Sequence, residues 1–109
     1  MDNKILVSIA NDFSITPGPR SKEEGKFSGE AFRLNILEPK FKEAVEKNKK
    51  LVVNLDGVLG YGTSFLEEAF GGLARQYGSE KVLEVLELVS VEEPYFADDI
   101  INYIKDASK

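Results

Sequence analysis

The strongest constraint on the fold is the run Leu-Val-Val-Asn-Leu at residues 51–55, which stands between lysines and an Asp-Gly pair. An apolar run with so little alternation is typical of a strand buried on both sides. A glycine-rich turn follows at residues 57–62, and Ser64 then opens a helix. Its apolar residues share one face, namely Phe65, Leu66, Ala69, Phe70, Leu73 and Ala74. The segment therefore predicts a strand, turn and helix of an α/β domain.

Before this unit, residues 4–10 predict an opening strand and residues 13–15 a brief second strand. The stretch between them and Gly29 contains Pro-Gly-Pro, which excludes a helix and predicts a long loop. Ser28 is expected to cap a helix that begins near Gly29. Pro39 should interrupt that helix and push Glu38 toward an extended conformation. We therefore expect two helices, or one broken helix, ahead of the central strand.

After this unit, Gly78 is expected to end the helix that starts at Ser64. Gly71 and Gly72 lower the helix propensity, and their presence suggests a close approach to the sheet or to a partner. Residues 86–91 predict a strand, and Pro94 suits the first position of a last helix. Together the signals predict an α/β fold with a small mixed or parallel sheet of about four strands flanked by helices.

Composition excludes several classes of function. The 109 residues suit a single domain spanning 1–109. There is no cysteine and no histidine, which excludes disulfides, thiolate catalysis, Cys-ligated zinc and Ser-His-Asp chemistry. Asp98 and Asp99 are adjacent on one helix, as are Glu67 and Glu68, so neither pair can aim both carboxylates at one ion or substrate. We expect no enzyme activity, no cofactor and no metal.

The charge distribution and the hydropathy of the chain indicate which classes of partner are disfavoured. Residues 1–79 carry 11 basic and 11 acidic side chains, whereas residues 80–109 carry 3 and 8, so the net charge of -5 arises in the last thirty residues. An acidic C-terminal part disfavours nucleic acid. The lysines at 40, 42, 47, 49 and 50 favour a solvated helix face over a patch for nucleic acid or anionic lipid. No stretch approaches the roughly 18 apolar residues of a membrane span, and no signal peptide is visible. We expect a cytoplasmic protein with no membrane partner.

The start of the helix at Ser64 has two interpretations, which are compatible. Ser64 and Glu67 have the spacing of a capping box, with Thr63 as a competing cap. Alternatively, Ser64 or Thr63 is phosphorylated or contacts an anion at an exposed helix start. In that case Glu67 and Glu68 would repel the added charge. The neighbouring residues Gly60, Tyr61, Gly62 and Phe65 are candidates for a partner surface.

These residues resemble the STAS domain family (sulfate transporter and anti-sigma factor antagonist), whose hallmark is a strand ending in Gly-Val and a helix opened by two serines. Gly57-Val58 and Thr63-Ser64 match, whereas Gly62 replaces an acidic residue and Phe65 a glycine. The chain is more similar still to the bacterial STAS-like domains of unknown function, in the motifs Pro17-Gly18-Pro19-Arg20, Ser28-Gly29-Glu30-Ala31-Phe32-Arg33 and the run from Ser64 to Leu73. The resemblance implies a small regulatory, protein-interaction module. By analogy its partner is a histidine-kinase-like ATPase, and Ser64 is the phosphorylated serine.

A second hypothesis concerns Arg20, Ser28, Glu30 and Arg33. Two arginines and a hydroxyl near a helix start can bind an anion such as a nucleotide phosphate. The chain would then be a small-anion or nucleotide sensor, with its ligand between the Arg20 loop and the Ser64 helix start. The competing interpretation pairs both arginines with surface carboxylates or packs their aliphatic stems.

Overall fold

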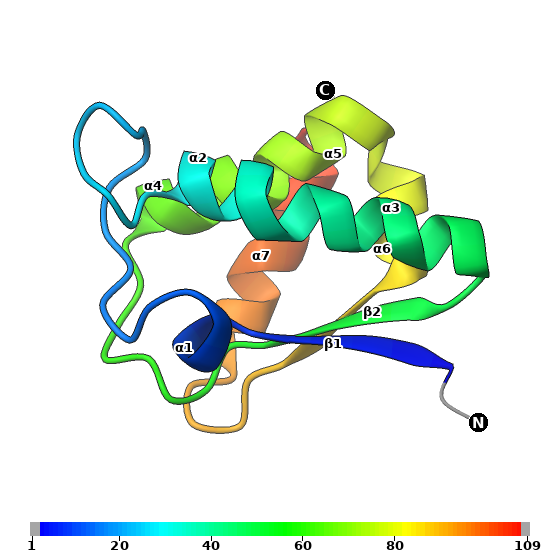
Figure 1. Cartoon of the computed structure of the whole chain (residues 1–109), viewed down its shortest axis with the longest axis horizontal. Helices are drawn as coiled ribbons and strands as arrows, with labels where there is room; N and C mark the ends of the chain where they lie inside the picture. Colours follow the sequence, from blue (N-terminus) through cyan, green and yellow to red (C-terminus); the bar gives the residue numbers. More distant parts are fainter. Residues whose placement is uncertain (1–2, 108–109) are drawn as a thin grey trace.

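The fold is built on a parallel sheet of three strands, as seen in a computed structural model that describes residues 3–107. The strands are β1 (Lys4–Ser8), β2 (Lys50–Asn54) and β3 (Leu86–Val89), in the order β1-β2-β3 (Figure 1). Val53 of the central strand lies beside Val7 on one side and Leu88 on the other. The carboxyl ends of all three strands therefore meet at one edge of the sheet.

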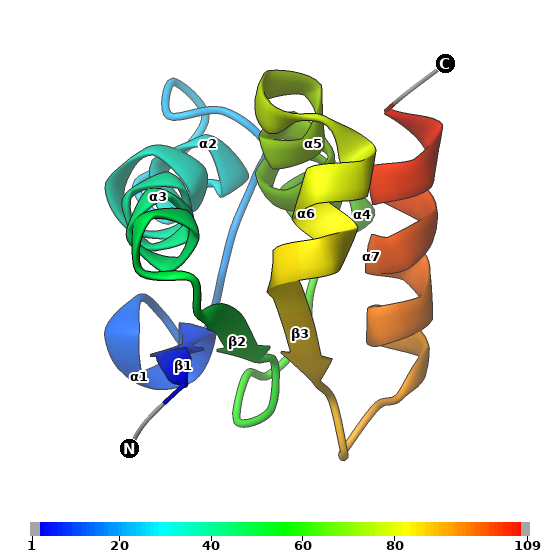
Figure 2. The same ribbon diagram turned by 90° about the vertical axis from the view of Figure 1, so that its right-hand side faces the viewer.

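Helical segments make both crossovers. The first consists of α1 (Ile9–Asp12), α2 (Gly29–Phe32), the π-helical η1 (Arg33–Leu37) and α3 (Glu38–Lys47). The second consists of α4 (Thr63–Leu66), the π-helical η2 (Glu67–Gly71), α5 (Gly72–Tyr77) and α6 (Ser79–Val85). After β3 the chain ends in α7 (Tyr95–Asp106). Helices α2 to α6 lie on one face of the sheet, and α7 stands on the β3 side (Figure 2).

The core lies between the sheet and the long helix that runs from α4 through η2 to α5. All six residues of its predicted apolar face are buried, as are Val53 of the sheet and Ile100 and Ile104 of α7. Gly78, with a φ of 94°, ends α5 as expected. Pro94 precedes α7 by one residue, close to its predicted place. Hydrophobic periodicity therefore located the main helix and the last helix correctly.

Side chains of the outer strands shield the central strand on the sheet's other face. Val52, which points away from the core cluster, is only 7% exposed. It pairs in register with Leu6 and Glu87, and the Lys4 ammonium meets the Glu87 carboxylate at 3.2 Å. This ion pair joins the two outer strands across β2. The apolar run at residues 51–55 is therefore buried on both faces of the sheet, as its pattern predicts.

The sheet has three strands instead of about four, because the brief strand predicted at residues 13–15 is absent. β1 ends at Ser8, earlier than predicted, where the Ser8 hydroxyl accepts a hydrogen bond from the Asn11 amide and caps α1. Phe13 follows in a turn, and its ring packs on those of Phe32 and Phe65, at 5.3 and 6.1 Å between centroids. The apolar residue that suggested a strand is therefore a core anchor on a loop. β3 likewise ends at Val89, before the predicted residue 91.

The predicted break at Pro39 is wrong. Glu38 is helical, with φ -64° and ψ -47°, and α2, η1 and α3 follow without interruption. The Glu38 amide donates to the carbonyl of Arg33, five residues back, so the turn before the proline is a π turn. This wider turn accommodates a residue that lacks an N–H and whose ring crowds the preceding turn.

Gly72 makes room for another helix and not for the sheet. A Cβ atom there would lie 2.7 Å from Arg33 Nε and 2.9 Å from Arg33 Cδ. At Gly72, the predicted close approach is therefore made to a side chain of η1, whereas a Cβ on Gly71 would meet Glu67 and Arg75 of its own helix.

Candidate functional site

The candidate site lies where the chain leaves the carboxyl end of β2. The Asp56 carboxylate accepts hydrogen bonds from the amides of Val91 and Glu92, at 3.1 and 3.0 Å. The Gly57 amide, in a residue with φ 88°, donates in return to Glu92 Oε1 at 2.8 Å. These three bonds hold the loop after β2 beside the loop after β3. The surface at this end of the sheet is therefore built from two connected loops.

Tyr61 anchors the loop instead of offering its hydroxyl to a partner. Its hydroxyl donates to the carbonyl of Leu55 at 2.8 Å, and its ring meets Phe96 edge-on at 5.0 Å. Burial raises the pKa of Tyr61 well above its usual range, and the charges of Asp56 and Glu92 raise it further. Of the residues predicted for a partner surface, Tyr61 thus has a structural role.

The exposed part of the site begins at Leu59, whose side chain is 79% exposed. The Leu59 amide donates to the carbonyl of Ile15 at 2.9 Å, and Ile15 is itself 53% exposed. Gly60 and Gly62 are exposed as well, and neither has an atom within 4 Å of the place where a Cβ would stand. Two apolar side chains and an open glycine pair therefore lie together on the surface.

Ser64 lies at the exposed start of α4 and forms no capping box. Gly62 occupies the N-cap position, and no side chain caps the helix. Glu67 turns away to Arg75 and Arg20, at 2.6 Å in each pair. Within residues 3–107 the Ser64 hydroxyl has no hydrogen-bond partner, and Thr63 beside it is also exposed. The structure leaves both hydroxyls accessible.

Phe65 is not part of the exposed surface. Its side chain is fully buried, stacked on Phe32 at 5.9 Å and close to Tyr61 at 6.0 Å. Phe65, the third residue of α4, therefore belongs to the core, and its neighbour Ser64 faces solvent. A helix turns about 100° per residue, which explains why adjacent residues differ in this way.

The anion hypothesis brought together Arg20, Ser28, Glu30 and Arg33, and the structure gives each of them a partner within the chain. Ser28 is fully buried, and its hydroxyl caps α2 by accepting from the Ala31 amide at 3.0 Å. Glu30 Oε1 accepts from the Lys22 amide at 2.9 Å. The amides of Gly29 and Glu30 donate to the carbonyls of Pro19 and Arg20, at 2.8 and 3.0 Å. The N-terminus of α2 therefore already holds carbonyl oxygens of its own loop.

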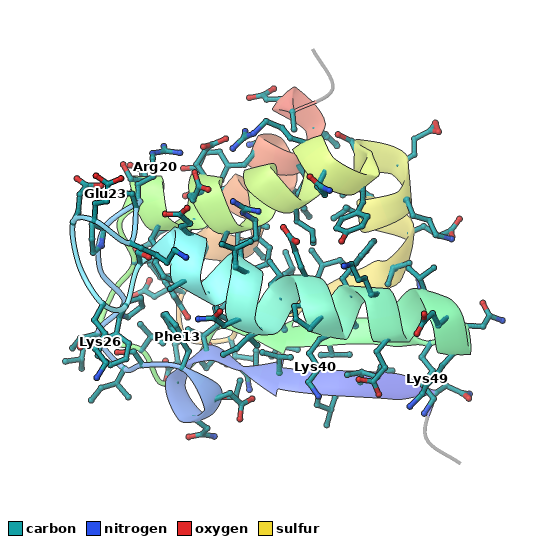
Figure 3. All side chains as sticks on the ribbon, turned by 45° about the horizontal axis from the view of Figure 1, so that its top comes forward. Phe13, Arg20, Glu23, Lys26, Lys40 and Lys49 are labelled. Carbon is teal, nitrogen blue, oxygen red and sulfur yellow. The ribbon has the colours of Figure 1, made fainter. Side chains whose placement is uncertain are left out.

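Both arginines pair with carboxylates. Arg20 Nη1 contacts Glu67 at 2.6 Å and Glu68 at 3.3 Å, and Figure 3 shows Arg20 where the loop meets the helices. Arg33 contacts Glu38 at 2.5 Å and Glu68 at 2.9 Å. The Arg75 guanidinium, and after it that of Arg20, lowers the pKa of Glu67.

Glu67 and Glu68 are the residues that the sequence-based interpretation missed as partners of the arginines. Arg20 lies 47 and 48 positions before them, so no local spacing signals the contact. Together with Glu38 and the three arginines they form a network of three positive and three negative side chains. This network fastens the loop between α1 and α2 to the helix that starts at α4.

The fold and the site together define a class of protein: a small α/β domain in which a buried parallel strand leads through a glycine-rich turn into a helix that opens with an exposed serine. A family model described as the STAS-like domain of unknown function (DUF4325) matches residues 28–96, from the buried cap serine to the start of α7. The chain belongs to this family. Neither a search of curated proteins nor a search of solved structures finds a match. None of the helices in residues 3–107 combines the length and apolar character needed to cross a bilayer.

Proposed function

We propose that this domain is a regulatory module that binds a protein partner through the carboxyl end of its sheet. The observation that carries the proposal is Leu59, an apolar side chain that is 79% exposed although its backbone is fixed to Ile15. An exposed apolar residue on a loop held by hydrogen bonds presents a preformed contact, so binding orders little additional chain. Gly60 and Gly62 next to it allow a partner's backbone to approach closely.

Ser64 is the switch in this proposal, and the partner is a histidine-kinase-like ATPase, by analogy with STAS domains. The kinase would transfer the γ-phosphoryl group of ATP to Ser64 Oγ. A new O–P bond forms, ADP leaves, and the hydroxyl proton passes to a base on the kinase. The phosphate would stand next to the surface that carries Leu59 and would change its charge by up to two negative units.

Two features of the helix start support a phosphate at this position. The first turn of α4 has no side-chain cap, so its amides and the helix dipole favour an added anion. The repulsion expected from Glu67 and Glu68 is offset, because each carboxylate pairs with two arginine side chains. As proposed, the module works in the cytoplasm and catalyses no reaction of its own.

A pull-down from the native host tests the proposal with three matched baits: wild type, Leu59→Thr and Leu6→Thr. Leu6 is 67% exposed on β1, on the sheet face opposite the core, so its substitution removes a similar apolar surface elsewhere. We expect a kinase-like ATPase on wild type and on Leu6→Thr, and its loss on Leu59→Thr. Purified ATPase with ATP should then add one phosphate to wild type and none to Ser64→Ala, read by intact mass.

Two results would contradict the proposal separately. Equal retention of the same ATPase by all three baits would exclude the surface around Leu59. An ATPase that binds but leaves Ser64 unmodified would exclude the phosphorylation switch while leaving the interaction in place.

A further inference from the structure

We propose that Arg20 is the phosphate-binding residue for Ser64 once that serine is phosphorylated, an inference that rests on the proposed function above. Arg20 would exchange at least one of its contacts with Glu67 and Glu68 for the phosphate. The ligand is therefore a phosphomonoester dianion that belongs to the chain itself.

The helix geometry places Ser64 on the side of the helix that carries the two carboxylates contacted by Arg20. At about 100° per residue up to the start of η2, Glu67 projects about 60° to one side of Ser64, and Glu68, the next residue, projects to the other side. A group that contacts both carboxylates therefore lies nearly in line with Ser64 along the helix. Side chains on a helix also lean toward its N-terminus, so the ends of both glutamates reach back toward the turn that carries Ser64. Arg20 contacts both of these carboxylates, through Nη1.

Arg20 also has N–H groups that are not used in its two ion pairs. Both of its ion pairs use Nη1, and nothing in residues 3–107 accepts a hydrogen bond from its Nε or Nη2. A guanidinium has five donors in a planar fork, which suits two oxygens of one phosphate. The Arg20 side chain is 43% exposed, so it can move between acceptors. Arg33 is 17% exposed and is held between Glu38 and Glu68.

Arg75 provides the matched control. It contacts Glu67 from the C-terminal side, 2.6 Å from Oε2, and no other carboxylate in the part of the chain described here. It lies 11 residues beyond Ser64, roughly three turns further along the helix. Replacing Arg75 therefore removes a cation from the same glutamate without removing one from the vicinity of Ser64.

The experiment uses the full chain with phosphoserine installed at position 64 during translation, so it does not depend on any kinase. Phosphorus NMR follows the second ionisation of the phosphate in wild type, Arg20→Gln and Arg75→Gln. The charged groups around it are Arg20, Glu67 and Glu68, with Arg33 and Arg75 behind the glutamates. We expect a pKa about one pH unit lower in wild type and in Arg75→Gln than in Arg20→Gln, because only Arg20 stabilises the dianion.

Equal phosphate pKa values in wild type and Arg20→Gln would overturn the proposal, as would an equal change in Arg75→Gln. A second measurement needs no variant of the phosphoprotein. The arginine side-chain N–H signals should shift on phosphorylation for Arg20 and stay in place for Arg75; an unmoved Arg20 signal would also overturn it. Either failure leaves the partner and the kinase of the proposed function untouched, because neither takes part in the experiment.

Discussion

Gly29 lies against the backbone of Phe65, so close that a Cβ atom on Gly29 would come within 2.6 Å of the Phe65 carbonyl oxygen. This contact joins the start of α2 to α4, and it brings the loop that carries Arg20 against the helix that carries Ser64. The Gly29 amide also donates a hydrogen bond to the carbonyl of Pro19. The loop, α2 and α4 therefore meet at Gly29.

Gly29→Ala should destabilise the domain by about 1–3 kcal/mol, because the neighbour is backbone and cannot rotate away. Alanine is the better helix former, so an ordinary helical glycine would give the opposite sign. Thermal or urea unfolding followed by circular dichroism measures the change. Gly62→Ala is the control: its φ of -80° suits alanine, and no atom lies within 4 Å of the new methyl group. A destabilisation of similar size in both variants would show that the contact with Phe65 does not decide the result.

Two serines at helix starts should behave differently when each is replaced by alanine. Ser28 is buried and caps α2, so Ser28→Ala should lower the free energy of unfolding by about 0.5–2 kcal/mol. Ser64 caps nothing, so Ser64→Ala should change it by no more than about 0.5 kcal/mol. Urea unfolding of both variants checks the difference. Equal losses would mean that Ser64 does cap its helix, as the capping-box spacing first suggested.

Alanine substitutions of Leu59 and Phe65 should affect different properties of the domain, namely partner binding and stability. Phe65→Ala removes a fully buried ring and should destabilise the domain by about 3–5 kcal/mol. Leu59→Ala removes a side chain that is 79% exposed, and it should leave stability within about 0.5 kcal/mol while weakening partner binding. Calorimetric melting of the two variants measures the changes in stability, and a pull-down with Leu59→Ala as bait measures partner binding. A large loss of stability in Leu59→Ala would make this residue part of the core and not of a contact surface.

Tyr61 should make the domain sensitive to alkali. Burial and the neighbouring carboxylates raise its pKa in the folded state above the usual value of about 10. Its contribution to stability is therefore complete below pH 10 and is lost as the pH rises toward the folded-state pKa. Ultraviolet titration of the four tyrosines should show Tyr61 ionising last, with its absorbance change missing in Tyr61→Phe. Tyr61→Phe should also lose stability less steeply above pH 10; an unchanged slope would contradict the assignment.

Local signals in the sequence were sufficient for most of the fold. The apolar run of β2, the one-sided stripe from Phe65 to Ala74, and Gly78 at the helix end each depend on neighbours within a turn or two of chain. Every residue predicted for the apolar stripe from Phe65 to Ala74 is buried in the structure. The failures came where a local signal had a distant cause. Phe13 is apolar because it packs on Phe32 and Phe65, and not because it belongs to a strand.

The sequence by itself determined that the chain forms an α/β domain with a hydroxyl residue at a helix start, because periodicity and turn residues act locally, and its motifs carried the resemblance to the STAS-like family. The tertiary structure alone decided what the charged residues of that site do. Arg20 and Glu67 are 47 residues apart, and only the packing of α2 on α4 brings them together. That packing pairs both arginines of the candidate anion site with carboxylates of the chain, and it leaves Leu59 and Ser64 exposed while it buries Phe65 in the core.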